Sequence, residues 1–409
     1  MTQLTSYHKK LFVFLSLASF FEGYDFTALG QILPNLRADM GMSEAGGGQL
    51  VAVVSAGTLL SYIFVRLADR YGRRRILSIT ILGYATFTFL TAFSRTPYDF
   101  AFYQIAARVF LVAEWALAMV YAAEEFPADR RGFVIGVIQA ATMLGSVVCA
   151  AVAPLLLSTA IGWRSVYLVG VIPMLLLAYA RRGLKESTRY LQQAGPQGMP
   201  TRPFTAIFQT KYGRRVFQVA LVWALTYICT QSAVIFWKEF AVNERGMTDG
   251  EVGLAIALAS IAALPFIFSV GKMVDSIGRR KSSVVIYSVG TVFVVAAFQM
   301  TNFWVLTLCL AVAFFSAVGL LTVLNAFTTE LFPTKWRADG FAWSNNLLGR
   351  IGYVVGPLIV GYSAGYVGWG NAVSFTVVFV IAALGLILWL FPETSGLELE
   401  EAAVAVLED

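Results

Sequence analysis

The stretch DRYGRRR at residues 69–75 recurs in related form as DSIGRRK at residues 275–281, and this repetition decides the fold. The same separation of 206 residues relates positions that follow each copy, namely Glu124 with Glu330, Phe126-Pro127 with Phe332-Pro333, and Arg131 with Arg337. Several matches at one fixed separation indicate an internal duplication. We therefore expect two halves of the same design.

Most of the chain around these motifs is apolar. Of its 409 residues, 58% are hydrophobic and 13% are charged, and the mean hydropathy is +0.71. Soluble proteins carry about 25% charged residues, so this balance argues against a soluble enzyme, a nucleic-acid-binding protein and a disordered scaffold. A membrane-spanning helix needs about 20 mostly apolar residues. Twelve such runs are predicted, at residues 11–30, 48–67, 76–94, 99–122, 132–157, 163–183, 214–237, 249–271, 282–300, 303–325, 338–365 and 369–391.

The basic residues indicate how these runs cross the membrane. With the N-terminus inside, 23 of the 30 Lys and Arg residues fall in inside segments and 5 in outside segments. Because positively charged loops are retained in the cytosol, we expect both termini to be cytoplasmic. The stretch 184–213 contains Gly and Pro but no long apolar run. It is the predicted linker between a first bundle, 1–183, and a second bundle with a cytosolic tail, 214–409.

Further motifs narrow the class of protein. EFPADRRG at 125–132 and ELFPTKWR at 330–337 follow the fourth and tenth runs, and KESTRYL at 185–191 and FPETSG at 391–396 follow the sixth and twelfth. Together with the two repeated loops, they resemble the major facilitator superfamily, in the branch of sugar porters, organic ion transporters and bacterial aromatic-acid/proton symporters. The resemblance implies an all-α membrane protein with twelve transmembrane helices in two pseudo-symmetric six-helix bundles.

The charged loop motifs also have a physical interpretation of their own. Carboxylates and guanidiniums at helix ends can pair bidentately, and Asp69 and Asp275 can cap adjacent helices. Exposed pairs contribute about 0–1 kcal/mol each, which suits a contact that must open during transport. Fixed stabilisation of helix ends is the alternative. The expected gating residues are Asp69, Gly72, Arg73, Arg74, Glu125, Arg131, Asp275, Gly278, Arg279, Arg280, Glu330 and Arg337.

Five ionisable residues fall inside the predicted spans: Glu22, Asp25, Arg108, Glu114 and Arg350. A charged side chain at mid-membrane costs about 2.5–3.5 kcal/mol on insertion scales, so such residues mark a transport pathway by default. The spacing gives Glu114 no clear partner, and both cavity lining and a pair with a loop arginine remain open for it.

The first span carries two of these acids in FFEGYD at residues 20–25. At about 1.5 Å per residue, Glu22 lies nearly level with Arg108, and Asp25 lies one turn further out on the same helix face. The motif resembles the first span of proton-coupled sugar porters and aromatic-acid symporters, where an acid near an arginine of the fourth span is implicated in proton coupling. We expect Asp25 to carry the proton and Glu22 to pair with Arg108. A static ion pair that braces the two spans is the alternative.

Arg350 stands in WSNNLLGRIG at residues 343–352, near the middle of the eleventh run. The residue 206 positions earlier is Leu144, so this arginine is not part of the duplicated scaffold. Its guanidinium can bind a carboxylate bidentately, and α-helical spacing puts Asn346 and Trp343 on the same face. The GRxG pattern resembles the eleventh span of aromatic-acid symporters and anion-type organic ion transporters. Pairing of Arg350 with an acid of the first run is the alternative.

The seventh run adds a stripe of aromatic and polar groups at helical spacing. Such stripes also occur as packing or lipid-facing surfaces, so both interpretations stay open. Candidates from the first bundle are Tyr24, Tyr62 and Gln139. The full predicted substrate-binding set is Arg350, Asn346, Trp343, Tyr24, Tyr62, Gln139, Trp223, Tyr227 and Gln231.

These features predict a secondary active transporter, a proton-coupled symporter of a small organic anion such as an aromatic carboxylate, working by alternating access. The alternatives are a proton-coupled sugar or polyol porter, a proton-driven exporter of drugs or metabolites, and a sensor that does not transport.

The few cysteines and histidines limit the chemistry. The three cysteines lie far apart, and His8 is the only histidine, so we expect no metal, no cofactor and no enzymatic activity. The expected partners are a small-molecule substrate, protons and the lipid bilayer, without nucleic acid. The chain is expected to act as a monomer in the inner (cell) membrane.

Overall fold

The computed structural model describes residues 5–171, 185–187, 191 and 203–395, without the side chains of 128, 129, 131, 132 and 264–268. This part of the chain is almost entirely helical. Its first half contains a helix over residues 164–171 and five long helices. These are α1 (Ser6–Asp39), α2 (Glu44–Tyr71), α3 (Arg73–Thr91), α4 (Pro97–Glu125) and α5 (Ala128–Leu157).

The second half begins with the 3₁₀-helix η2 (Phe204–Gln209). Three of its spans are interrupted: the seventh consists of α8 and α9, the eleventh of α13, a π-helical segment η3, and α14, and the twelfth of α15 and α16. The helices are α8 (Gly213–Ile235), α9 (Trp237–Arg245), α10 (Asp249–Ile277), α11 (Arg279–Gln299), α12 (Phe303–Glu330), α13 (Arg337–Phe341), η3 (Ala342–Gly349), α14 (Ile351–Val367), α15 (Trp369–Phe375) and α16 (Val377–Leu390).

Eleven of the twelve predicted spans coincide with described helices, and the sixth, 163–183, is described only up to residue 171. Nine helices of the described chain are long and apolar enough to cross a membrane. Only 22% of the apolar window of α5 and 28% of the window over 369–390 are buried in protein. The exposed side chains include Trp389 and Tyr366, at 80% and 91%. Apolar helices that expose so much of their surface have lipid as their natural solvent.

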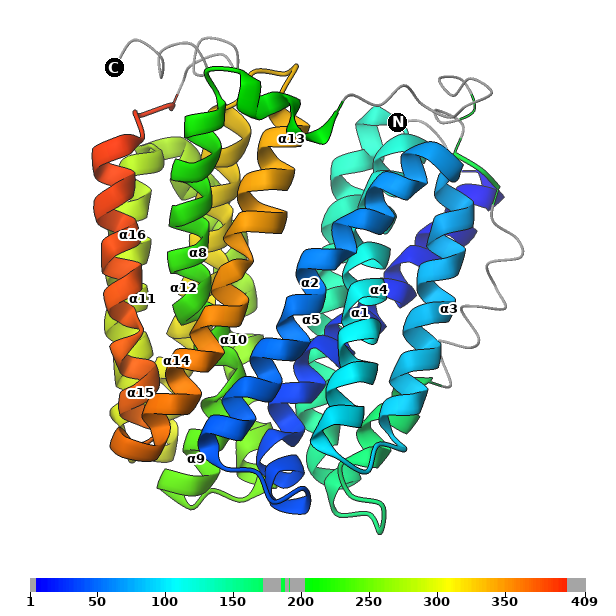
Figure 1. The fold of residues 1–409 in the computed structure, drawn as a ribbon. Coiled ribbons are helices and arrows are strands. Elements are labelled where there is room, and N and C mark those ends of the chain that lie inside the picture. The colour runs from blue at the N-terminus through cyan, green and yellow to red at the C-terminus, as the bar shows by residue number, and fades with distance from the viewer. Residues whose placement is uncertain (1–4, 172–184, 188–190, 192–202, 396–409) are drawn as a thin grey trace. The chain divides into compact units, whose positions relative to one another are not determined.

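Contacts divide the chain into two compact units. Unit 1 comprises Met1–Gly41 and Val53–Arg202, and unit 2 comprises Met42–Ala52 and Pro203–Asp409. The start of α2 belongs to unit 2, where Gln49 donates a hydrogen bond of 2.5 Å to the Tyr362 hydroxyl. The boundary after residue 202 falls inside the predicted linker, whose extent stays a prediction. Figure 1 shows α8, α11, α12 and α16 running side by side in unit 2.

Local sequence signals explain where the helices begin. Thr96 and Thr248 each accept a hydrogen bond from the backbone N–H three residues later, and the acids at those positions, Asp99 and Glu251, bond back to the threonine N–H. These capping boxes satisfy donors that the first helical turn leaves free. The helices α4 and α10 therefore start at sites that the sequence specifies.

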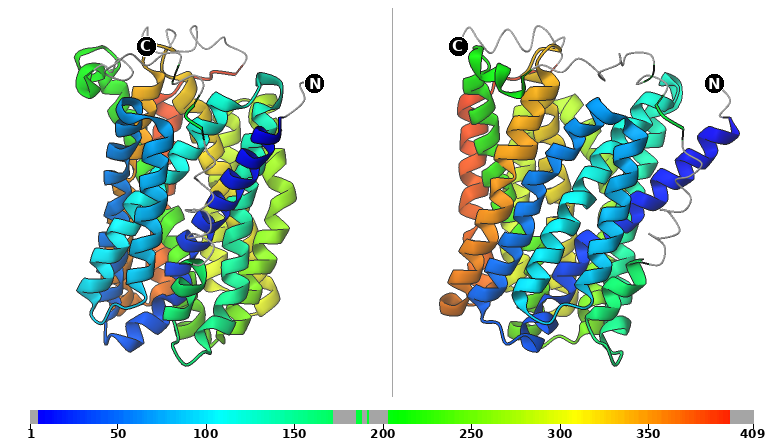
Figure 2. Two further views of the ribbon diagram at one scale, coloured as in Figure 1. Left: turned by 90° about the vertical axis from the view of Figure 1, so that its right-hand side faces the viewer. Right: turned by 45° about the vertical axis from the view of Figure 1, so that its right-hand side comes forward.

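The same pair of spans packs most closely in each half. In unit 1, α1 lies against α5, and a Cβ added to Gly145 would lie 1.8 Å from the Phe20 carbonyl oxygen. In unit 2, α8 lies against α14, and a Cβ at Gly352 would lie 2.2 Å from the Ala224 oxygen. Figure 2 shows α1, in dark blue, tilted across the other helices of unit 1. Glycine is required because two helix backbones meet there, as is common inside membranes.

Candidate functional site

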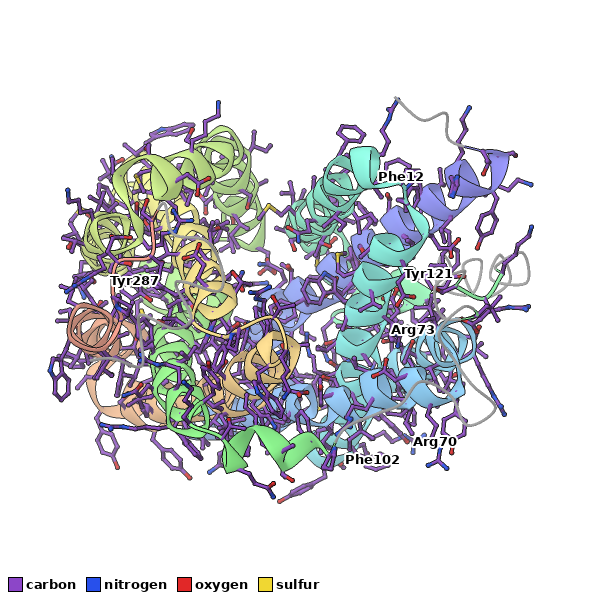
Figure 3. All side chains as sticks on the ribbon, turned by 90° about the horizontal axis from the view of Figure 1, so that it is seen from above. Phe12, Arg70, Arg73, Phe102, Tyr121 and Tyr287 are labelled. Atoms are coloured by element: carbon purple, nitrogen blue, oxygen red, sulfur yellow. The ribbon has the colours of Figure 1, made fainter. Side chains whose placement is uncertain are left out.

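A charged cluster in unit 1, here called the Arg73 cluster, joins three elements. The Arg73 guanidinium pairs with Asp69 on α2, and its Nε and Nη2 donate to Glu124 Oε1 on α4 at 3.3 and 3.2 Å. The Ser187 hydroxyl donates to the other oxygen of Glu124 at 2.5 Å. Figure 3 shows Arg73 within unit 1, with Arg70 at its rim. The exposed fractions are only 7% for the Arg73 side chain and 14% for that of Glu124, so this is not the exposed pair that the sequence predicts.

Unit 2 repeats the arrangement in what we call the Arg279 cluster. Arg279 lies 3.3 Å from Asp275, and its Nη2 donates to Glu330 Oε1 at 2.7 Å. The Thr394 hydroxyl donates to the second oxygen of Glu330 at 2.5 Å. The duplicated motifs therefore build duplicated ion-pair networks, each closed by a hydroxyl from the segment that follows the unit's last span.

Glutamates of those same segments cap the helices that begin directly after the two repeated loops, α3 in unit 1 and α11 in unit 2. Glu186 accepts from the Arg74 backbone N–H at 3.1 and 3.3 Å, and Glu393 accepts from the Arg279 and Arg280 N–H groups at 2.8 and 2.9 Å. The prediction that Asp69 and Asp275 cap these helices is therefore wrong, because both carboxylates pair with arginine instead.

Glycine makes room for one of these caps. Gly72 and Gly278 have φ values of 99° and 94°, and a Cβ at Gly278 would lie 2.7 Å from a carboxylate oxygen of Glu393. Positive φ and this close approach both select glycine.

The outcome for three other expected gating residues is different. Arg73 donates to Glu124, the acid that the 206-residue repeat identifies, whereas the predicted set names Glu125, one position later. Arg337 donates to the Thr329 carbonyl at 2.7 Å, and the Arg131 side chain lies outside the described residues. Burial lowers the pKa of Arg73, but Asp69 and Glu124 outweigh it and raise that pKa above its ordinary value.

A second cluster lies between the spans of unit 1. Asp25 and Arg108 are 3% and 4% exposed and interact electrostatically. The Arg108 guanidinium lies over the Phe26 ring at 4.8 Å, and its Nη1 has no hydrogen-bond partner among the described residues. Tyr84 on α3 interacts with both Asp25 and Arg108. The structure thus brings Asp25 and Arg108 together.

The other unit 1 candidates have different surroundings. Glu22 is half-buried on α1, and the depth estimate that pairs it with Arg108 remains a prediction. Tyr24 donates to the Val166 carbonyl at 3.0 Å, a contact internal to the unit. Tyr62 is half-buried and Gln139 is exposed.

Arg350 directly follows a change of helix type. Residues 342–349 form a π-helix, whose bonds span five residues instead of four. Asn345 is buried and accepts a 2.8 Å hydrogen bond from Tyr227, whereas Asn346 is half-buried and its place beside Arg350 remains a prediction. Arg350 interacts electrostatically with Tyr227, whose ring lies 4.4 Å from that of Tyr353. Within the described chain, Arg350 Nε is buried and has no hydrogen-bond partner.

Two predicted binding residues, Trp343 and Trp223, donate hydrogen bonds to other groups, and a third, Gln231, is buried. Trp343 stacks on Phe204 at 4.3 Å and donates to its carbonyl at 2.8 Å, so it ties the π-helix to η2. Trp223 is 1% exposed and donates to Thr328 at 2.9 Å. Gln231 is buried at 7% exposure.

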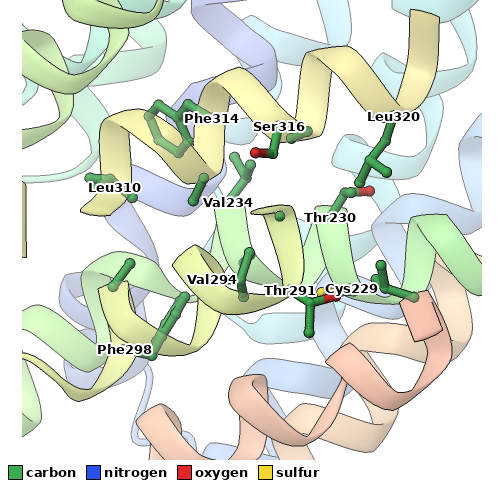
Figure 4. A pocket seen from close by; sticks show the side chains of 16 residues that line it. Cys229, Thr230, Val234, Thr291, Val294, Phe298, Leu310, Phe314, Ser316 and Leu320 are labelled. Carbon is green, nitrogen blue, oxygen red and sulfur yellow. The ribbon is translucent and has the colours of Figure 1, made fainter. Parts of the chain in front are cut away.

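One enclosed cavity in unit 2 is too small for a metabolite. It has a volume of about 20 Å³ and lies among α8, α11, α12 and α16, where Thr230, Thr291 and Ser316 contribute hydroxyls to an otherwise apolar wall (Figure 4). Such a space holds about one water molecule. This cavity is therefore not a substrate site.

The sequence also misses a buried cation. Lys238, predicted in an outside segment, is only 2% exposed and lies 2.6 Å from Asp249. Lys238 lies in α9, directly after the helix is interrupted at Phe236. A continuous apolar run gives no sign of this interruption.

Two arginine-centred networks, charged groups between apolar spans and a duplicated helical scaffold define a multi-pass membrane transport protein and not an enzyme. A sequence model of the Major Facilitator Superfamily matches residues 15–240 and 219–405. The chain belongs to this superfamily.

Relatives and a solved structure agree with that assignment. The chain is 28% identical to the cis,cis-muconate transport protein of Acinetobacter baylyi, over 92% of this chain and 93% of that one. It is 27% identical to a probable 4-methylmuconolactone transporter of Cupriavidus pinatubonensis, over 94% and 90%. A bacterial homologue of the human lysosomal transporter Spinster has the same fold, with a TM-score of 0.76 at 15% identity over 95% and 97% of the two chains.

Proposed function

We propose that this protein is a proton-coupled symporter that imports a small organic anion by alternating access. It acts as a monomer in the inner membrane, with both termini in the cytoplasm. The observation that carries the proposal is Arg350, a guanidinium inside a span whose buried Nε lacks a hydrogen-bond partner among the described residues.

The chemistry around Arg350 favours a carboxylate. A guanidinium presents paired donors that match the two oxygens of a carboxylate. Asn345 and Tyr227 supply polar groups beside it, while Tyr227 and Tyr353 supply aromatic faces. An aromatic or otherwise unsaturated carboxylate can place its charge on Arg350 and its flat apolar part against these rings.

The names of the relatives support the same substrate class. One is a transporter of cis,cis-muconate and another is named for 4-methylmuconolactone. A sugar porter needs no guanidinium at mid-membrane, so Arg350 counts against the sugar or polyol alternative.

Asp25 is the proposed coupling group. It is buried beside Arg108, so its ionised form is favoured when the two are close and disfavoured when a movement separates them away from water. That difference loads and unloads one proton. The Arg73 and Arg279 clusters, at the proposed cytosolic ends of the spans, hold the inner helix ends in one conformation and release them in the other.

A thermal-shift screen of the purified full-length protein tests the substrate class. The panel contains cis,cis-muconate, benzoate, nicotinate, xylose and a cationic drug. A ligand that binds only the folded protein raises the melting temperature by mass action. We expect carboxylates to stabilise the wild type and not Arg350→Ala. Arg245→Ala is the control, because the Arg245 guanidinium donates to backbone carbonyls at a helix end and lies over the Phe240 ring.

Other outcomes decide between the alternatives. Stabilisation by xylose alone would support a sugar porter, and stabilisation by the cationic drug alone an exporter. Carboxylate binding without uptake in proteoliposomes would support a sensor.

A further inference from the structure

A short aromatic stack joins the 3₁₀-helix η2 to the eleventh span. The Phe204 ring lies 4.3 Å from the Trp343 ring at an interplanar angle of 15°, and the Trp343 indole N–H donates to the Phe204 carbonyl at 2.8 Å. The Phe208 ring meets the same indole in a T-shaped arrangement at 4.8 Å. The residue 206 positions before Trp343 is Val137, so the duplicated scaffold does not include this contact.

The helix η2 is itself fixed to the start of α8. Ile207 is fully buried, and the Phe208 ring lies 5.4 Å from that of Phe217. A Cβ added to Gly213, the first residue of α8, would lie 3.0 Å from the Phe208 Cα, so the two backbones are in close contact. In the turn between them, the Thr210 hydroxyl donates to the Ile207 carbonyl at 2.6 Å. A side chain that stacks on η2 is therefore held against α8 as well.

The segment between Trp343 and Arg350 is π-helical, and such segments are rare in proteins. Two contacts with α8 hold it beyond the stack: Asn345 accepts from Tyr227, and a Cβ added to Gly349 would lie 2.7 Å from a side-chain carbon of α8. An α-helix and a π-helix place successive residues at different angles around the axis. Conversion of this segment to an α-helix would therefore change the direction of the Arg350 guanidinium relative to Trp343.

We propose that Trp343 is a positioning residue for the anion site: stacked on η2, it holds residues 342–349 in the π-helical form and so sets the direction of the Arg350 guanidinium. Trp343 acts on the substrate through Arg350 and not by contact, whereas the sequence places it in the binding set. The proposal rests on the proposed function, because it concerns the role of Arg350, but the hold of η2 on the segment is measurable without any substrate.

Hydrogen exchange of the full-length protein in detergent, read by mass spectrometry without substrate, measures this hold. We expect Phe204→Ala and Trp343→Ala to speed exchange at residues 342–350 by about tenfold, the change that loss of an aromatic stack and a hydrogen bond produces in a local opening equilibrium. Thr205→Ala, at an exposed position of the same 3₁₀-helix, is the matched control and should exchange like the wild type. Unchanged exchange at 342–350 in Phe204→Ala would overturn the proposal.

Calorimetric titration of the same variants with cis,cis-muconate tests the positioning role. We expect Phe204→Ala and Trp343→Ala each to weaken binding about tenfold, because the apparent affinity falls with the fraction of protein in the binding-competent form. The double variant should bind no more weakly than either single variant, since both changes remove the same contact. Trp343→Phe, which keeps an aromatic ring against Phe204, should recover part of the affinity.

The pattern across these variants separates positioning from direct contact. If Trp343 touched the substrate, Trp343→Ala would bind weakly while Phe204→Ala bound like the wild type, and this result would overturn the proposal. An equal loss of affinity in Thr205→Ala would overturn it too, because the effect would then not depend on the stack. If the wild type binds no carboxylate at all, the proposed function fails, whereas hydrogen exchange still decides whether η2 holds the segment.

Discussion

At the scale of single residues, the polar surroundings of Arg350 include Tyr227 and the asparagines of the preceding segment. Tyr227 interacts electrostatically with Arg350 and donates a 2.8 Å hydrogen bond to the buried Asn345, whereas Asn346 is half-buried. Both asparagines lie in a π-helical segment, a feature that is frequent at functional sites.

Replacing each asparagine by alanine shows which of the two supports carboxylate binding. Asn345→Ala removes the hydrogen bond that orients Tyr227, so we expect carboxylate affinity to fall by about 1–2 kcal/mol, roughly a factor of 5–30. Asn346→Ala, the matched control, should change affinity less than about threefold. Calorimetric titration with cis,cis-muconate measures both, and a larger effect for Asn346→Ala would contradict the role of the Tyr227–Asn345 hydrogen bond.

A comparison of a buried with an exposed ion pair tests the Arg73 cluster. Glu124→Gln removes the charge that accepts from Arg73 and Ser187, and we expect thermal unfolding to report a loss of about 2 kcal/mol. Asp39→Asn, which removes the charge of the exposed pair with Arg164, should cost less than about 1 kcal/mol. Equal losses of stability in the two variants would contradict a special contribution of the buried cluster.

The sequence predicts part of this residue-scale organisation. The 206-residue repeat identifies Asp69, Arg73 and their counterparts Asp275 and Arg279. When a charged residue is repeated in both halves, its oppositely charged partner is repeated at the same separation. The caps made by Glu186 and Glu393 are not predicted, although the two acids match at a separation of 207, because a capping role depends on where a distant chain segment returns. The π-helical segment before Arg350 is not predicted, because helical spacing assumes a constant number of residues per turn.

At the scale of secondary structure, the closest contacts are between α1 and α5 and between α8 and α14. Sequence reasoning locates each of these spans, because 20-residue apolar runs are unambiguous, but α1 continues to Asp39, nine residues beyond the predicted end at residue 30. It does not predict which spans pair, because every helix here has apolar residues on most faces. The structure shows that glycines allow these pairs of helices to approach closely.

Two glycines of the same helix α5 test this packing. Gly145→Ala places a methyl group 1.8 Å from the Phe20 carbonyl oxygen, so the helices must separate. We expect a loss of stability of about 2 kcal/mol or more and a lower yield of folded protein. Gly136→Ala, where nothing lies within 4 Å, should be neutral or stabilise by up to about 1 kcal/mol. Melting temperatures in detergent compare them, and equal values would contradict a close α1–α5 contact.

At the scale of the whole molecule, the duplication accounts for the scaffold and not for the chemistry. Both units repeat the ion-pair clusters and the close helix contacts, but the charges inside the spans are not repeated. The residues 206 positions after Asp25, Arg108 and Glu114 are Gln231, Phe314 and Leu320, and Arg350 corresponds to Leu144. We infer that unit 1 holds the proton-coupling groups and unit 2 holds the anion-binding guanidinium.

The central claim, that one carboxylate crosses together with protons through Arg350 and Asp25, is tested most directly by proton flux. Proteoliposomes that contain a pH-sensitive dye receive external cis,cis-muconate, and protein-free liposomes measure passive entry of the acid. We expect the lumen of wild-type vesicles to acidify faster than that of the controls, and Arg350→Ala and Asp25→Asn vesicles to behave like protein-free ones. Muconate uptake without acidification, or undiminished acidification in Arg350→Ala, would contradict the account.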